Sequence, residues 1–289
     1  MKIAHCQIEC TPGDIEANIA KVVAGLERAE AEGIEIISFP ESFLTGYFSD
    51  AAKAREHSFA IDGPEIRALL ERTAGFSATF MVGFNERRDD DLYNTVLVAE
   101  KGQCLGSYSK VFPIFDYFTP GRRFPVFQRG EVTFGVVICA DGGYIEPVRI
   151  LALKGAQIIF APHYNFLAKQ SLINHFMSVR ADHVARAREN GVWFFRGNQV
   201  TSGLDAGRPQ RDGVGYGDSY LMDPMGEIVV RSSRHVECMI SANVDVSDQA
   251  LLSTPLYAST RKRSIRSLKL LGAMTMELAE CHPHVHRDP

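Results

Sequence analysis

Val132-Thr-Phe-Gly-Val-Val-Ile-Cys-Ala-Asp-Gly-Gly-Tyr-Ile-Glu-Pro-Val-Arg149 is the stretch that decides the fold of this chain. Its first seven residues, 132–138, form an apolar run rich in β-branched side chains, which is typical of a strand buried on both faces. Asp141 and two glycines then indicate a turn, and helical spacing follows. Cys139 is therefore predicted at the tip of a buried strand, where open α/β folds place reactive groups.

A free cysteine is usually a small apolar core residue, so Cys139 needs partners before it becomes a candidate nucleophile. Glu41 follows a predicted strand at 34–39, and Lys110 follows another at 104–109. The ends of neighbouring strands converge in an α/β fold, so the three side chains are expected to lie together. A carboxylate could take the thiol proton, and an ammonium could stabilise the negative charge that develops.

The overall composition is typical of a globular protein, with 45% hydrophobic and 23% charged residues in a 289-residue chain. A net charge of -4 gives no basic excess for nucleic acid, and no apolar run is long enough to predict a membrane span. The N-terminus lacks the apolar region of a signal peptide. Six scattered cysteines without a CxxC pair favour reduced thiols and a cytoplasmic location. The cysteine- and histidine-rich tract at 281–286 is the one metal-like cluster, and we expect no metal there.

The order of predicted elements repeats a strand–helix–strand unit followed by hairpin-like strands. This pseudo-doubling predicts two βαβ-containing halves in one sandwich, with helices on the outer faces. No linker interrupts the pattern, so a single domain is predicted over 1–265, with 266–289 as a helix end and tail that makes oligomer contacts or is disordered. The helices are expected at 15–32, 64–73, about 144–155 and 171–190.

Several motifs occur in a fixed order along the chain. They are Gln7 with Gly13-Asp14 and Asn18; Phe39-Pro-Glu41 with Thr45-Gly-Tyr47; Tyr93-Asn-Thr95, Tyr108-Ser-Lys110 and Pro120-Gly121; Ile138-Cys-Ala-Asp141 with Glu146 and Arg149; and Arg188-Glu-Asn190, Gly197-Asn-Gln199, Gly217-Asp-Ser219 and Asp223-Pro-Met-Gly226. Each motif alone is weak, but the ordered set is highly specific. Over about residues 2–265 the sequence resembles the nitrilase superfamily of carbon–nitrogen hydrolases, in its amidase and N-carbamoyl amidase branch.

This resemblance implies a four-layer α-β-β-α sandwich and a Glu-Lys-Cys triad. Glu41 would be the general base, Cys139 the nucleophile, and Lys110 the group that holds the oxygen of the tetrahedral intermediate. The backbone N–H of Ala140 would be a second oxyanion donor. The reaction would proceed through a thioester and need neither a metal nor an organic cofactor.

Two positions depart from the family pattern. Ala140 stands where many members have an aromatic residue after the nucleophile. The family usually carries another glutamate in the loop after the lysine, whereas Asp116 is the sole acid in 111–119. We hypothesise that Asp116 replaces it; the alternative is that Asp116 is a turn residue and the site has lost that group. Candidates for substrate binding, each of which could equally be a packing residue, are Tyr47, Phe118, His163, Tyr164 and Asn165.

The leading interpretation is hydrolysis of a small linear amide or N-carbamoyl compound, with release of ammonia or an amine. A nitrilase is less favoured, because nitrilases proper usually carry Trp and Glu after the cysteine. A papain-like Cys-His hydrolase is disfavoured, and a catalytically lapsed binding protein stays open. The family implies a homodimer or larger homo-oligomer. The identity of the substrate depends on the loops 49–63, 111–119 and 201–217, whose conformations the sequence does not predict.

Overall fold

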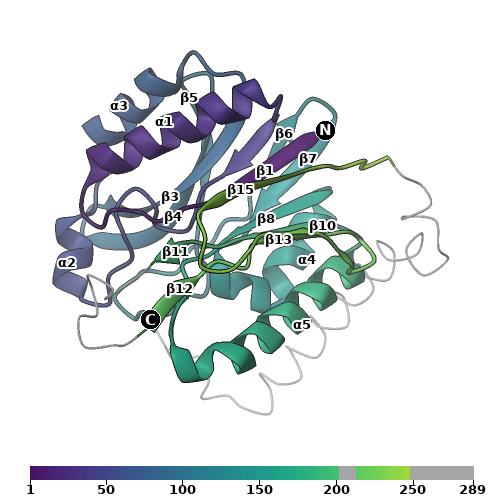
Figure 1. The fold of residues 1–289 in the computed structure, drawn as a ribbon. Coiled ribbons are helices and arrows are strands. Elements are labelled where there is room, and N and C mark those ends of the chain that lie inside the picture. The colour runs from purple at the N-terminus through teal and green to yellow at the C-terminus, as the bar shows by residue number, and fades with distance from the viewer. Residues whose placement is uncertain (202–212, 248–289) are drawn as a thin grey trace, which may run out of the picture.

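Two six-stranded β-sheets pack face to face in the computed structural model, which describes residues 1–201 and 213–247. Helices cover both outer faces, so the molecule has four layers (Figure 1). Across the first sheet the strands are β15 (Cys238–Asn243), β1 (Lys2–Gln7), β2 (Ile36–Ser38), β3 (Thr79–Arg88), β4 (Asp91–Glu100) and β5 (Gln103–Ser109). Across the second they are β14 (Ile228–Arg231), β13 (Tyr220–Met222), β10 (Trp193–Gly197), β8 (Ile158–Pro162), β7 (Val132–Val136) and β6 (Val126–Arg129). The predicted α-β-β-α sandwich is confirmed.

The two sheets share one plan. In the first, β1, β2 and β3 are parallel, and β4, β5 and β15 pair antiparallel at the edges. In the second, β7, β8 and β10 are parallel, and β6, β13 and β14 pair antiparallel. A small third sheet of β9 (Phe166–Ala168), β11 (Val200–Thr201) and β12 (Gly213–Tyr216) was not predicted. The repeated strand–helix–strand pattern in the sequence therefore corresponds to two similar halves.

Apolar side chains form three clusters, one in each space between the layers. The first lies between the first sheet and the helices α1 (Ile15–Ala31) and α3 (Pro64–Thr73), and the second lies between the sheets. The third packs the second sheet against α4 (Ile145–Leu153) and α5 (Leu172–Asn190). Burial on both faces explains why the central strands are continuously apolar.

Helix boundaries follow local capping signals. The Asp14 carboxylate accepts a hydrogen bond of 3.0 Å from the Ala17 N–H and caps α1. Gly191 ends α5 in the left-handed conformation, with φ of 63°. The short helix α2 (Ala51–Glu56) lies in a segment predicted as a loop, because only Ala54 of its six residues is buried and no apolar periodicity results.

Among the described residues, every helix is too short or too polar to span a bilayer. The predicted tail at 266–289 and the cluster at 281–286 lie outside the described residues.

Strand β3 passes directly beneath the turn that follows β2. The Leu44 N–H donates to the Gly83 carbonyl over 2.9 Å. A Cβ atom on Gly83 would lie 2.8 Å from the Glu41 carbonyl carbon and closer still to the Ser42 nitrogen. Glycine at this position therefore permits the close approach that fixes the Glu41 backbone.

Substituting Gly83→Ala is expected to displace this turn and lower the free energy of unfolding by about 1–3 kcal/mol, as overpacking does. Urea denaturation measures the change. Gly75→Ala is the matched control, because a Cβ there would meet no atom within 4 Å, and its effect is expected to stay within about 0.5 kcal/mol. Equal stability of the two variants would contradict the proposed packing constraint.

Candidate active site

Glu41 and Lys110 form a buried ion pair at the ends of two strands of the first sheet. The Lys110 Nζ lies 2.7 Å from the Glu41 Oε1, and the side chains are 1% and 0% exposed. The Asn94 amide donates to the same oxygen over 2.7 Å, and the Tyr164 N–H donates to Oε2 over 2.8 Å. Burial is the largest single effect and opposes the charge on Lys110, but the Glu41 carboxylate and smaller contributions from neighbouring groups together outweigh it, so the pKa of Lys110 is raised well above its usual range.

Cys139 begins a short 3-10 helix, η1 (Cys139–Gly143), that follows β7 in the second sheet. Its φ of 48° is in the left-handed region, which is unfavourable for a residue with a side chain and often marks a functional position. Burial, followed by the Glu41 carboxylate to which the thiol is hydrogen-bonded, raises its pKa to about 12, against the opposing charges of Lys110 and Arg196. The resting thiol is therefore protonated at neutral pH.

Asp141 joins the cysteine turn to the lysine strand. Its buried carboxylate accepts hydrogen bonds from the Tyr108 hydroxyl over 2.7 Å and from the Phe112 N–H over 2.8 Å. It also accepts from the N–H groups of Val111 and Ile138, at 3.2 Å each. Tyr108 belongs to the first sheet and Ile138 follows a strand of the second, so one carboxylate links the elements that carry Lys110 and Cys139.

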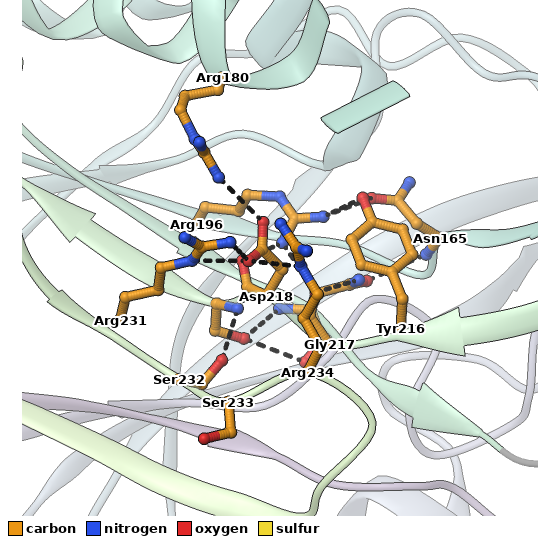
Figure 2. Close-up of polar contacts among 12 residues, drawn as sticks. Asn165, Arg180, Arg196, Tyr216, Gly217, Asp218, Arg231, Ser232, Ser233 and Arg234 are labelled. Atoms are coloured by element: carbon orange, nitrogen blue, oxygen red, sulfur yellow. Dashed lines mark hydrogen bonds and ion pairs between the residues drawn. The ribbon is translucent and has the colours of Figure 1, made fainter. Parts of the chain in front are cut away.

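Asn165 contacts the thiol, and Arg196 is hydrogen-bonded to Asn165, as Figure 2 shows for that pair. The Asn165 Nδ2 lies 3.4 Å from the Cys139 Sγ. The Asn165 Oδ1 accepts from Arg196 over 2.7 Å, which fixes the amide with its NH₂ group toward the sulfur. Arg196 is fully buried in β10 and also donates to the carbonyls of Gly217 and Asp218 and to the hydroxyl of Tyr216.

Three further arginines surround the buried Asp218 carboxylate, as Figure 2 shows. Arg180 lies 3.5 Å from it, Arg234 lies 3.2 Å from it, and Arg231 also pairs with it. Asp218 has a φ of 65°, so this ion cluster holds an unfavourable backbone conformation. The carbonyls that bind Arg196 are thereby kept in place.

A cavity of about 300 Å³ opens onto Cys139. Four of the five predicted substrate-binding residues line it: Tyr47, His163, Tyr164 and Asn165. Phe118 is buried and stacks on Tyr47 with 6.3 Å between ring centroids, so it packs behind the wall. The other lining residues are Ile114, Cys139, Ala140, Gly143, Phe166, Leu167, His175, Val179, Asp182 and His183.

Asp116 lies exposed on its loop and does not line this cavity. The acid that does so is Asp182, on α5, which the sequence reasoning missed. The available signal was the helical spacing of His175, Val179, Asp182 and His183, which places them on one face of α5. Among the described residues, no group of three or more His, Cys, Asp or Glu side chains could hold a metal ion.

Comparison with known proteins agrees with this architecture. The family model for carbon-nitrogen hydrolases matches residues 2–252. The chain belongs to the carbon-nitrogen hydrolase family. This membership and its amidase relatives identify a hydrolase of carbon–nitrogen bonds.

Relatives of this carbon-nitrogen hydrolase differ in their activities. A 2-oxoglutaramate amidase of Bacillus subtilis is 27% identical over 90% of this chain and 97% of its own length. A glutamine-dependent NAD(+) synthetase of Thermotoga maritima is 28% identical over 88% of this chain, but the match spans 43% of that protein. Among solved structures, a carbon-nitrogen hydrolase of Helicobacter pylori is 21% identical, with a TM-score of 0.74 and 94% of each chain covered. A Nesterenkonia amidase gives a TM-score of 0.67 at 21% identity, over 88% of this chain and 96% of its own.

Loss of the amide that faces the thiol is expected to make Cys139 less reactive. Asn165→Ala removes the donor to the sulfur, and Arg196→Met removes both the orienting group and a nearby positive charge. Both changes disfavour the thiolate, so we expect alkylation of Cys139 by iodoacetamide at fixed alkaline pH to slow by about tenfold, which corresponds to one pKa unit.

The alkylation rate is measured by mass spectrometry of the peptide that contains Cys139. Circular dichroism confirms that the variants fold. Asn174→Ala, on α5 but outside the cavity lining, is the control and should react as the wild type does. Unchanged rates in the folded Asn165→Ala protein would contradict the assigned contact.

Proposed function

We propose that this protein hydrolyses the C–N bond of a small linear amide or N-carbamoyl compound, with Cys139 as the nucleophile. The observation that carries the proposal is the Glu41–Lys110 ion pair, buried near a protonated thiol that lines a cavity of about 300 Å³. A carboxylate, a cation and a thiol in contact supply the base, the electrostatic stabiliser and the nucleophile of an acyl transfer.

The raised pKa of Cys139 determines the first step. Because the thiol is protonated at rest, its proton must move as the sulfur attacks the amide carbon, and the hydrogen-bonded Glu41 carboxylate is placed to accept it. Lys110 and the Asn94 amide hold the carboxylate in position. A new C–S bond forms, and the carbonyl π electrons move to the oxygen.

The resulting oxyanion requires donors beside the sulfur. Lys110 is the nearby cation, and the Ala140 N–H lies next to Cys139 at the cavity wall. Glu41 then returns the proton to the leaving nitrogen, the C–N bond breaks, and ammonia or an amine departs from a thioester. Water attacks this thioester with Glu41 again as the base, which releases the acid and regenerates the thiol.

The direct test is a panel of small amides, N-carbamoyl compounds and nitriles, followed by ammonia release and intact-protein mass spectrometry. We expect release from amides or N-carbamoyl compounds and an acyl adduct on the wild type, and neither on Cys139→Ala. Glu41→Gln is expected to lower the rate by about 10²–10⁴-fold, the usual contribution of a general base.

Turnover of nitriles alone would favour a nitrilase. If no compound in the panel is turned over and iodoacetamide fails to modify Cys139 even at alkaline pH, a binding protein that has lost its catalytic activity would be favoured. Both outcomes would contradict the proposal.

The hypothesis that Asp116 replaces the family's loop glutamate as a second catalytic acid can be tested separately. Because the Asp116 side chain is exposed and outside the cavity, we expect Asp116→Asn to acylate at a rate within about twofold of the wild type, as surface substitutions usually have small effects. Stopped-flow or quenched-flow acylation with the best amide measures this. A loss of 100-fold or more, of the order that a general acid contributes, would restore Asp116 as a catalytic residue.

A further inference from the structure

One face of α5 forms part of the wall of the cavity that Cys139 also lines. We call it the α5 wall: His175, Val179, Asp182 and His183. Asp182 lies against the end of η1, since its Oδ2 would be 3.5 Å from a Cβ atom on Gly143. Gly143 is four residues beyond Cys139 in a helix that rises about 2 Å per residue, so Asp182 is on the order of 8 Å along from the nucleophile.

This separation places the Asp182 carboxylate beside the end of a bound substrate that lies farthest from Cys139. A carboxylate at that distance cannot exchange a proton directly with the thiol or with the leaving nitrogen of an amide whose carbon is bound at Cys139. It can contact a group about four bonds away from that carbon, given bond lengths of about 1.5 Å. Ile114, Phe166 and Leu167 add an apolar lining to the same cavity.

The histidines around this end of the cavity carry no charge at neutral pH. Burial lowers the pKa of His163 and of His183 well below the usual value, and that of His175 to about 4. The His163 Nδ1 lies 2.7 Å from the Ala161 carbonyl, which can only accept. The proton is therefore on Nδ1, and the Nε2 atom of His163 is a hydrogen-bond acceptor.

Among the described residues, Asp182 is the one lining side chain of this cavity that carries a charge at neutral pH. The positive charge of Arg196 also acts on the three histidines, but Arg196 is not a lining residue and is hydrogen-bonded to Asn165. Asp182 is half-buried, and no described residue forms an ion pair with it. Arg186, one turn further along α5, pairs with Glu189. Burial raises the pKa of the Asp182 carboxyl, against the opposing charge of Arg186. A carboxylate desolvated without a partner is stabilised when a cation binds beside it.

We propose that Asp182 binds a protonated amine of the substrate, so that the preferred substrates are small linear amides or N-carbamoyl compounds with an amine at the opposite end. The inference rests on the proposed hydrolase function. The carboxylate attracts the ammonium group, the neutral imidazoles do not repel it, and the apolar lining accommodates the methylenes between. A substrate with a carboxylate at the same position would be repelled by Asp182.

Three matched amides test this proposal: 4-aminobutanamide, pentanamide and glutaramate. They carry an ammonium, a methyl and a carboxylate group at the same position. In the wild type we expect kcat/KM for 4-aminobutanamide to exceed that for pentanamide by about 10- to 100-fold, the scale of one charge-assisted hydrogen bond. Glutaramate is expected to be the poorest of the three.

Asp182→Asn should reduce the ratio of kcat/KM for 4-aminobutanamide to kcat/KM for pentanamide to about threefold or less, mainly through the loss on 4-aminobutanamide. Asp90→Asn is the control, because it removes the same charge from an exposed turn outside the cavity lining. It should keep the full preference. Calorimetric titration of the Cys139→Ala protein should show the same ranking of affinities without any chemistry.

The outcomes separate the two proposals. Turnover of pentanamide at least equal to that of 4-aminobutanamide in the wild type would overturn the amine site and leave the hydrolase function standing. An equal loss on both amides in Asp182→Asn would also overturn it, because it would indicate a structural role. Absence of turnover with every amide, while Cys139→Ala still binds 4-aminobutanamide more tightly than pentanamide, would contradict the hydrolase function and support the amine site.

Discussion

Glu41 and Lys110 are two opposite charges placed almost entirely out of water, and the site depends on this pair. Burial of an ion pair is costly, and their mutual attraction offsets the cost only when further hydrogen bonds satisfy the remaining atoms. Asn94 and the Tyr164 N–H supply those bonds. Removal of either charge would leave the other buried and unpaired, which typically costs about 3–5 kcal/mol. The fold therefore constrains both side chains strongly, and the geometry available to Cys139 follows from it.

The site exists only when both halves of the sandwich have assembled. Glu41 and Lys110 follow strands of the first sheet, whereas Cys139 follows a strand of the second. Asp141 connects the two, since its carboxylate binds groups from both sides. The Cys139 backbone is held in a left-handed conformation at that junction. Correct placement of the nucleophile is thus a consequence of global folding rather than of the local turn alone.

Sequence patterns predicted the layers and placed Glu41 and Cys139 at the ends of apolar strands. Lys110 follows β5, a strand that is largely polar and partly exposed, so its place in the ordered motifs is the stronger signal. The patterns did not single out Asp182, because helical spacing places it on one face of α5 with three other lining residues but does not indicate what that face packs against. Arg196 had a usable signal that was missed, namely a charge inside a strand of large apolar residues. For Asp116, the loop contained an acid at a plausible spacing, but the path of the loop turns that side chain to solvent. The direction of a loop depends on tertiary contacts that spacing does not encode.

The central claim is that Cys139 rests as a thiol and passes its proton to Glu41 only during attack. The most direct measurement is the ultraviolet thiolate absorbance of the wild type minus that of Cys139→Ser, followed as the pH rises from neutral. Burial and the Glu41 carboxylate raise the thiol pKa to about 12, so the account predicts no difference signal near neutral pH and a rise only in strongly alkaline solution. A full thiolate signal at neutral pH would contradict it, because the cysteine would then already be ionised and Glu41 would not be its base.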